Sequence, residues 1–361
     1  MKVLFLASYP VTAAATRFRL HQYFPHLQSD GIECVLSPYL KENDFATLYD
    51  RRSPAQKAAR LLQLAVRRVV GSLRSSKFDL VYVQREAMLM GPPIVEWIVA
   101  RLLRIPLVFD FDDAIWVAYE SPTYGRLATL LKFPKKTHKI LEMARHIVVA
   151  SESNRKWVSE THARNDVTVI PTVVDADEFS PAAPPFGEAP VVGWIGTHST
   201  ARLLESIGPA LSACARRNPF RLHIVGAGRT LSFEGVDTQC DAWSLEREPE
   251  DYRRMDVGLH PVPDDEWNRG KAGFKAIGYM SCGVPVISSP VGGVTEFLQH
   301  GVNGMFANSQ SEWEQHLTAY LQGPALRRAH GSAGRKTVLA RYCLQRQAPV
   351  MSTLLRQVAA R

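Results

Sequence analysis

The sequence predicts an α/β fold made of two doubly wound parallel-sheet domains, and three observations support this prediction. The chain has 361 residues, roughly twice the ~100–200 residues of a common domain. Short apolar runs alternate with longer amphipathic stretches, which is typical of βαβ units. The alternation occurs twice, and the run 175–185 between the two series, which has no periodicity and contains Pro181, Pro184 and Pro185, indicates a linker.

The strand-like runs give the elements of each domain in order. They lie at 3–7, 33–36, 80–83, 107–111 and 147–150 in the first domain, and at 191–195, 221–225, 257–260, 285–288 and 304–307 in the second. We expect an N-terminal Rossmann-like domain over 1–180, a C-terminal Rossmann-like domain over 186–345, and a helix at 346–361 that packs back on the N-terminal domain. Ligands of open α/β sheets bind at the carboxyl ends of the strands, so functional residues should lie in loops that face an interdomain cleft.

The composition excludes several classes of protein. With 46% hydrophobic and 22% charged residues, the chain is neither disordered nor a coiled coil. The five cysteines include no CxxC pair, so neither a disulfide framework nor a structural zinc site is expected. The apolar stretch 94–109 contains Glu96, Arg101 and Arg104, which argues against a membrane span. We expect a cytoplasmic protein, soluble or peripheral to the inner face of the membrane.

Two loops of the second domain have the composition of a phosphate-binding site. In Gly270-Lys271-Ala272-Gly273-Phe274-Lys275, a helix beginning near Lys271 would present free backbone N–H groups and two lysines one turn apart to a diphosphate. The loop Gly196-Thr197-His198 follows a strand and precedes a capped helix, so its N–H groups also point toward the ligand face. The alternative interpretation is that the glycines only turn the chain and that the lysines and His198 are solvated.

The first domain carries acidic and basic candidates. Asp110, Asp112 and Asp113 follow an apolar strand, and neighbouring carboxylates raise one another's pKa, so one could act as an acid or base or bind sugar hydroxyls. Alternatively, they could cap a helix and pair with Arg85. Arg17 and Arg19 lie in the first loop, where they could bind phosphate or only keep a helix face soluble.

Four sequence runs together resemble a known family. They are Met280-Ser281-Cys282-Gly283-Val284-Pro285-Val286, Val291-Gly292-Gly293 followed by Glu296, His300-Gly301-Val302-Asn303-Gly304, and Val169-Ile170-Pro171 leading to Asp175 and Phe179. With these runs the chain resembles the retaining GT-B glycosyltransferases of family 4 (glycosyl transferases group 1). The resemblance implies a hexosyltransferase, acting in cell-envelope polysaccharide or glycoconjugate synthesis, that moves a sugar from a nucleoside-diphosphate donor to a saccharide or lipid-linked acceptor. It implies no metal and no other cofactor.

The chain departs from this family at two positions. Members usually carry two glutamates that hold the donor, and counting back from Met280 places them at Gly270 and Gly278. The chain therefore resembles a branch that lacks the two-glutamate motif. Two alternatives follow, a nucleotide-sugar epimerase on the same fold and a degenerate, non-catalytic nucleotide-sugar-binding protein.

The resemblance also implies roles for the candidate residues. The donor-binding residues are then Gly196, Thr197, His198, Lys271, Gly273, Phe274, Lys275 and Glu296. Asp112 and Asp113 are then the catalytic carboxylates, and Arg17 and Arg19 bind the acceptor. The site is expected to hold no metal.

The segment 51–77 predicts a membrane surface as a further partner. Residues 51–77 contain eight basic and no acidic residues around an apolar stripe. Such a basic amphipathic helix favours contact with an anionic membrane surface, although its apolar face could simply pack on the sheet. Nucleic acid is not expected, because the chain has no recognisable nucleic-acid-binding module.

Overall fold

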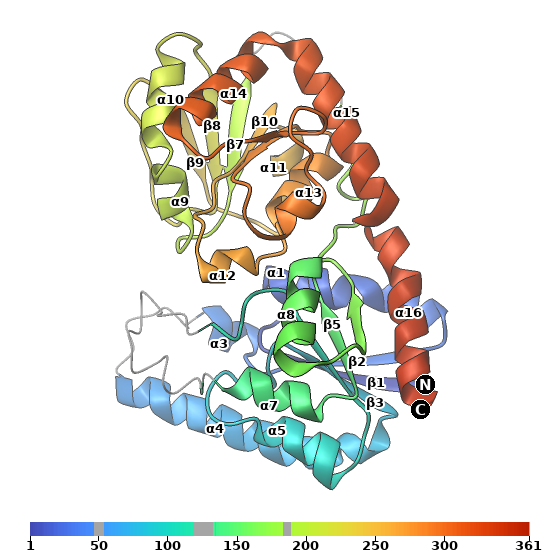
Figure 1. The fold of residues 1–361 in the computed structure, drawn as a ribbon. Coiled ribbons are helices and arrows are strands. Elements are labelled where there is room, and N and C mark those ends of the chain that lie inside the picture. The colour runs from blue at the N-terminus through green and yellow to red at the C-terminus, as the bar shows by residue number, and fades with distance from the viewer. Residues whose placement is uncertain (47–53, 118–132, 134, 183–188, 361) are drawn as a thin grey trace. The chain divides into compact units, whose positions relative to one another are not determined.

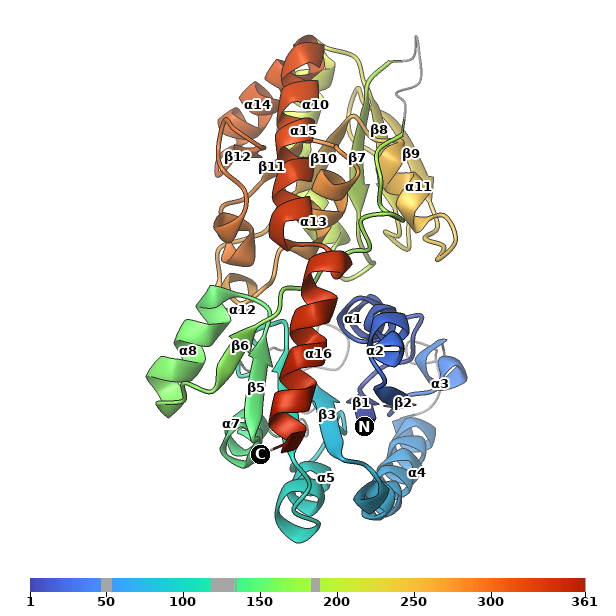
Figure 2. The same cartoon turned by 90° about the vertical axis from the view of Figure 1, so that its right-hand side faces the viewer.

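The computed structural model describes residues 1–46, 54–117, 133, 135–182 and 189–360. The chain divides into two compact units, Met1–Thr172 with Gln347–Arg361, and Val173–Arg346. Each unit holds one six-stranded sheet whose strands are all parallel, with helices flanking it (Figures 1 and 2). The predicted α/β class with two doubly wound parallel sheets is therefore confirmed.

The sheet of the first unit has the order β2-β1-β3-β4-β5-β6. Its strands are β1 (Lys2–Ala7), β2 (Glu33–Pro38), β3 (Leu80–Gln84), β4 (Leu107–Phe111), β5 (His146–Val149) and β6 (Val167–Val169). Every residue of β3 and β4 is buried, as expected for the centre of a sheet covered on both faces. The chain leaves β1 toward β2 and returns on the other side as β3, so the order reverses between β1 and β3.

The helical segments of the first unit are α1 (Ala14–Arg19), η1 (His21–Tyr23), α2 (Phe24–Ser29), α3 (Glu42–Ala46), α4 (Pro54–Ser72), η2 (Leu73–Lys77), α5 (Ile94–Trp97), η3 (Ile98–Leu102), α7 (Lys136–Met143) and α8 (Glu152–His162). Helix α5 contacts both α4 and α7, and the views of Figures 1 and 2 agree on this. The apolar stretch 94–109 thus divides into α5, η3 and β4. No helix of the described residues is long and apolar enough to cross a membrane.

The sheet of the second unit has the order β12-β11-β10-β7-β8-β9. Its strands are β7 (Val191–Ile195), β8 (Arg221–Val225), β9 (Asp237–Asp241), β10 (Val257–His260), β11 (Val286–Ser288) and β12 (Met305–Phe306). The sequence analysis missed β9, because this edge strand is polar and only half-buried. It also missed β6 of the first unit, which has three residues.

The helical segments of the second unit are α9 (Ala201–Glu205), α10 (Gly208–Ala215), α11 (Glu248–Arg253), α12 (Glu266–Arg269), α13 (Phe274–Ser281), η4 (Gly292–Glu296), α14 (Gln310–Gln322) and α15 (Pro324–Arg341). Helix α10 packs against α14, and α13 packs against α15. The last helix, α16 (Leu344–Ala360), begins in the second unit, while Gln347–Arg361 group with the first.

The division between the units lies at Thr172, earlier than the boundary at 180 that we expected. Side chains of the second unit hold the segment after Thr172. Ser281 Oγ donates to Phe179 O at 2.8 Å, Arg335 Nη1 donates to the same oxygen at 2.7 Å, and Arg253 Nε donates to Ser180 O at 2.9 Å. Local composition does not reveal this boundary, because the side chains that donate these hydrogen bonds lie on helices far away in the sequence. Residues 183–188 of the expected linker lie outside the described residues.

Candidate functional site

The loop after β7 lies where the strand order of the second unit reverses. Strands β7 and β10 are neighbours, with Val257 opposite Val192, and the chain leaves them toward opposite edges. Ligands of doubly wound sheets bind outside the carboxyl ends of two such strands. Gly196, Thr197 and His198 follow β7 directly, so the fold places these three predicted residues at this position.

Glycines bring two loops of this region into close contact. A Cβ atom at Gly226, which has φ +80°, would lie 2.4 Å from Gly196 O, and one at Gly228 would lie 2.9 Å from His198 Cβ. The Gly196 amide donates to Val225 O at 2.9 Å. Side chains at either glycine would separate the loops that follow β7 and β8. The loop with Thr197 and His198 is thus held in place by backbone contact, and both of its side chains are exposed.

The two predicted phosphate-binding lysines do not share one helix. Helix α12 ends at Arg269 and α13 begins at Phe274, so Lys271 lies in the loop between them and Lys275 in the first turn of α13. Our expectation of a helix beginning near Lys271 is therefore wrong. Gly273 adopts φ +73°, which lets the loop turn directly into α13.

This loop is fixed to η4, the segment that ends at Glu296. A Cβ atom at Gly273 would lie 2.9 Å from Val294 N, and the Gly293 amide donates to Lys271 O at 2.7 Å. The backbones of residues 271–273 and 292–294 are therefore in contact. The structure therefore brings Lys271, Gly273 and η4 together, and their role in donor binding stays a prediction. Phe274 and Lys275 follow directly and are partly buried.

Lys275 lies in an electropositive environment. Its Nζ is 4.9 Å from the centroid of the Trp194 ring, and no ion pair or hydrogen bond to it is found within the described part of the chain. Burial, together with the charge of Lys271, lowers the pKa of Lys275 to about 7. Burial also lowers the pKa of His260, at the end of β10, to about 3, with Lys275 and Lys271 adding to the effect. His260 is thus neutral, and this region favours an anionic ligand.

The structure gives a packing reason for the missing second glutamate. A Cβ atom at Gly278 would lie 2.7 Å from Tyr252 Cζ, so the Tyr252 ring fills the space of a side chain there. Tyr252 packs edge-on against Tyr279 with 4.9 Å between ring centroids, and the Tyr279 hydroxyl accepts a hydrogen bond from the Ile195 amide at 3.0 Å. Sequence analysis missed this tyrosine pair because the two residues lie far apart in the chain, on α11 and α13.

In the first unit, Arg85 binds both predicted catalytic carboxylates. Its Nε donates to Asp112 Oδ1 at 2.9 Å, and its Nη2 forms an ion pair with Asp113. Arg85 directly follows β3 and Asp112 directly follows β4, so the two neighbouring strands bring them together. The charge pair with Arg85 that we considered as an alternative role is thus present. Both carboxylates also keep some exposure, 13% for Asp112 and 21% for Asp113, so they remain accessible to a substrate.

The ionisation of Asp112 follows from these charges. Burial acts to raise the pKa of Asp112, but the positive charges of Arg85 and Arg19 and the hydrogen bond from Arg85 outweigh burial, so the pKa is lowered. Asp112 is therefore a carboxylate at neutral pH. In that state it can accept a hydrogen bond from a hydroxyl or stabilise a developing positive charge, but it has no proton to donate.

Arg19 does not have the surface position that an acceptor-binding residue needs. Its side chain is buried and ion-paired with Asp110, which is also buried. Its Nε donates to Asp110 Oδ2 at 3.2 Å. Burial raises the pKa of Asp110, although the charge of Arg19 acts in the opposite direction. Our expectation for Arg19 is therefore corrected to a structural role. Arg17 is partly buried, and its Nη1 donates to Thr12 O at 3.2 Å.

Comparisons with known proteins agree with this architecture. Residues 208–352 match the family model described as "Glycosyl transferase-like". The D-inositol 3-phosphate glycosyltransferase of Segniliparus rotundus is 23% identical over 267 residues, and the match covers 66% of this chain and 58% of that protein.

Two solved structures are similar over nearly the whole chain. Sucrose-phosphate synthase from Thermosynechococcus elongatus has a TM-score of 0.71 at 16% identity, covering 99% of each chain. HepE of Anabaena, in complex with UDP and glucose, has a TM-score of 0.71 at 16% identity, covering 99% of this chain and 100% of the other. The fold is thus that of the GT-B glycosyltransferases, as predicted. The assignment of the chain to family 4 stays a prediction.

Proposed function

We propose that the chain is a retaining hexosyltransferase that moves a sugar from a nucleoside-diphosphate donor to a saccharide or lipid-linked acceptor. The observation that carries this proposal is the electropositive region around Lys271 and Lys275, close to the point where the strand order reverses between β7 and β10. Both lysines lie within residues 208–352, which match the glycosyltransferase-like family model. The titles of the HepE structures name UDP, glucose and UDP-glucose. UDP and UDP-glucose are therefore the first ligands to test.

The donor diphosphate would bind at the loops that follow β7 and β10. Backbone N–H groups of Gly196 and Thr197, the start of α13 and the two lysines would stabilise the departing diphosphate electrostatically. Phe274 and Glu296 would complete the donor site. We expect this arrangement to act without a metal, since the backbone N–H groups and the two lysines would supply the positive charge.

The acceptor would bind at the carboxyl end of the first sheet. Asp112 would orient the acceptor hydroxyl or stabilise the developing charge, with Asp113 beside it and Arg17 contributing to acceptor binding. Synthesis of a cell-envelope polysaccharide or glycoconjugate on the cytoplasmic side of the membrane fits such an enzyme. We also propose contact with an anionic membrane, whose surface is argued in the next subsection.

Two measurements test the proposal. A thermal-shift screen of UDP, GDP, ADP and their sugars should identify the nucleotide, because a ligand at 100 times its Kd stabilises the native state by about 2.7 kcal/mol. Release of nucleoside diphosphate should then require an acceptor and should continue in EDTA. Release that stops in EDTA and returns with magnesium or manganese would contradict the metal-free site. Turnover of the nucleotide sugar to its epimer would favour the epimerase, and ligand binding without any turnover would favour the non-catalytic binding protein.

A further inference from the structure

Helix α4 carries a second apolar stripe, directed away from the core. Leu62, Val66, Val70 and Leu73 are all exposed, from 67% at Leu62 to 50% at Leu73. Their spacing of three or four residues places them along one side of the helical segment α4–η2. A different side of α4, with Leu64, packs into the core of the first unit. Packing on the sheet therefore explains only one of the two stripes.

Three basic residues of the predicted segment have structural roles within the first unit. Arg60 forms an ion pair with Asp44 at 2.7 Å, Arg67 donates to Tyr39 O at 2.8 Å, and Arg68 is buried and donates to Ser37 O at 2.9 Å. Arg74 and Lys77 are exposed. Arg51 and Arg52 lie outside the described residues.

A neighbouring segment has the same combination of exposed apolar and basic residues. Helix α5 contacts α4, and η3 contacts η2. On α5 and η3, Ile94 is 42%, Trp97 51% and Leu102 56% exposed. Arg101 and Arg104 are exposed beside them. Tryptophan favours the boundary between water and lipid headgroups, because its ring is apolar while its N–H needs a polar partner.

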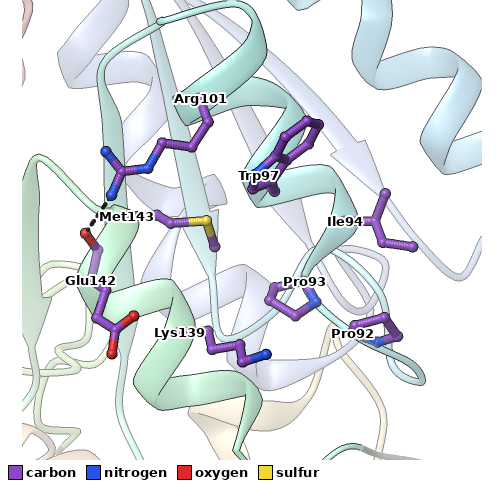
Figure 3. A pocket seen from close by; sticks show the side chains of 8 residues that line it. All are labelled: Pro92, Pro93, Ile94, Trp97, Arg101, Lys139, Glu142 and Met143. Atoms are coloured by element: carbon purple, nitrogen blue, oxygen red, sulfur yellow. Dashed lines mark hydrogen bonds between the residues drawn. The ribbon is translucent and has the colours of Figure 1, made fainter.

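A groove of about 410 Å³ continues this apolar surface. Figure 3 shows Ile94, Trp97 and Arg101 along one side of it and Lys139, Glu142 and Met143 of α7 along the other. Arg101 Nη2 donates to Glu142 O at 3.1 Å, and this hydrogen bond links the two sides of the groove. The groove adds the exposed Pro92 and the partly buried Met143 side chain to the apolar surface, and the exposed Lys139 adds positive charge.

From these observations we propose that α4–η2 and α5–η3 form one membrane-docking surface, which lies on an anionic lipid bilayer with Leu62, Val66, Val70, Leu73, Ile94, Trp97 and Leu102 in the headgroup region. Charge complementarity selects this partner. Residues 54–77 contain no acidic residue, and Glu96, the one acidic residue of α5–η3, is buried. Glu142 is an exposed carboxylate of the groove, and the exposed Arg101 and Lys139 line the same groove. Arg74, Lys77 and the two exposed arginines of η3 and the following turn would contact lipid phosphates.

Other occupants fit the surface less well. A second copy of the chain would oppose one basic surface to another, which is unfavourable. Nucleic acid would leave the two exposed apolar stripes in water. The residues of this docking surface would make the proposed membrane contact. Their binding to lipid does not depend on whether the second unit transfers sugar.

Co-sedimentation of the full chain with vesicles tests the proposal. We expect binding to vesicles of phosphatidylcholine with about 30% phosphatidylglycerol at low salt, weaker binding at high salt, and little binding to phosphatidylcholine alone. The charge-reversed variant Arg74→Glu/Lys77→Glu/Arg101→Glu should lower the partition coefficient by at least about 100-fold, since each of the three basic residues contributes about 1 kcal/mol near an anionic surface and each glutamate is repelled by it. The variant Val66→Ser/Val70→Ser/Trp97→Ser should lower it by about tenfold without a change of net charge.

Matched controls separate this surface from a general charge effect. Arg216→Glu/Arg328→Glu/Lys336→Glu makes the same charge change at exposed positions of the second unit and should leave binding unchanged. Brominated lipid should quench a component of tryptophan fluorescence that is lost in Trp97→Phe. Equal loss of binding in both charge-reversed variants, absence of that quenched component, or dimerisation of the wild type through these helices would each overturn the proposal. UDP binding by the same variants, measured without lipid, reports separately on the proposed transferase site.

Discussion

Arg85 Nε donates a hydrogen bond to Asp112 Oδ1 at 2.9 Å, and the same guanidinium pairs with Asp113. Arg85 makes these contacts from a left-handed backbone conformation, with φ 64°. Such a conformation costs a non-glycine residue ~1–3 kcal/mol and persists only where surrounding contacts favour it. The orientation of both carboxylates at the end of β4 therefore depends on one residue at the end of β3.

The first prediction concerns the role of Asp112. Because its lowered pKa keeps it ionised, Asp112→Asn removes a charge while keeping the shape of the side chain. We expect kcat to fall by about 10²-fold with donor affinity unchanged, which is the typical effect of removing one electrostatic contact to a transition state. Steady-state kinetics with the donor identified by thermal shift measures both quantities.

Asp113→Asn and Arg85→Lys are the matched controls for this prediction. Asp113→Asn should have the smaller effect on kcat. Arg85→Lys keeps a positive charge and should lose less turnover than Arg85→Met. If Asp113→Asn loses turnover and Asp112→Asn keeps it, Asp113 is the residue that acts.

The second prediction concerns pH and Lys275. With a pKa of about 7, Lys275 is mostly protonated at pH 6 and mostly neutral at pH 8. The charge of Lys271 contributes to this lowered pKa. A diphosphate binds the protonated form, so its affinity should fall as the pH rises. If only that form binds, the fall between pH 6 and pH 8 is about tenfold.

Isothermal titration calorimetry in buffers of different ionisation enthalpy checks this prediction. Binding of nucleoside diphosphate at pH 8 should be accompanied by proton uptake. Lys275→Arg, which stays charged, should bind without that uptake and with a flatter pH profile. Lys275→Ala should weaken binding more than Lys271→Ala, and equal wild-type affinity in both variants would contradict the diphosphate site. Proton uptake that persists in Lys275→Arg would assign the proton to another group.

The fold could be predicted from sequence because its central strands have a recognisable local pattern. The runs 80–83, 107–111 and 257–260 are buried along their whole length and largely apolar, as central parallel strands are. The positions of Gly196 and Lys275 near the β7/β10 reversal also follow from strand order, because functional loops of this fold class lie at carboxyl ends.

The contacts of the site could not be predicted in the same way. The pairing of Arg19 with Asp110 joins residues 91 positions apart, and local sequence cannot distinguish a buried arginine from a solvated one. The packing of Tyr252 against Gly278 likewise depends on how α11 and α13 meet. Local composition identified the residue types, whereas the partner of each side chain is set by tertiary packing.

The third prediction concerns that packing. Gly278→Ala should destabilise the protein by about 1–3 kcal/mol, because a Cβ atom 2.7 Å from Tyr252 Cζ forces one of them to move. Gly71 also lies in a helix, and a Cβ atom there would meet nothing within 4 Å, so Gly71→Ala should be neutral or stabilising by up to about 1 kcal/mol. Thermal unfolding of both variants gives the comparison. If Gly278→Ala and Gly71→Ala have equal melting temperatures, the Tyr252 ring moves aside at no cost in free energy.

The fourth prediction concerns the buried pair of Arg19 and Asp110. Asp110→Ala leaves a buried guanidinium without its counter-charge, and we expect a loss of about 3–5 kcal/mol in the free energy of unfolding. Arg19→Met/Asp110→Leu removes both charges and should be less destabilised than Asp110→Ala, since no unpaired charge stays buried. Glu160→Ala breaks an exposed pair with Lys156 in the same unit and should change stability by at most about 1 kcal/mol. Urea unfolding, monitored by circular dichroism, measures the free energy of unfolding of the three variants. A urea midpoint of Asp110→Ala equal to that of Glu160→Ala would show that Arg19 reaches solvent.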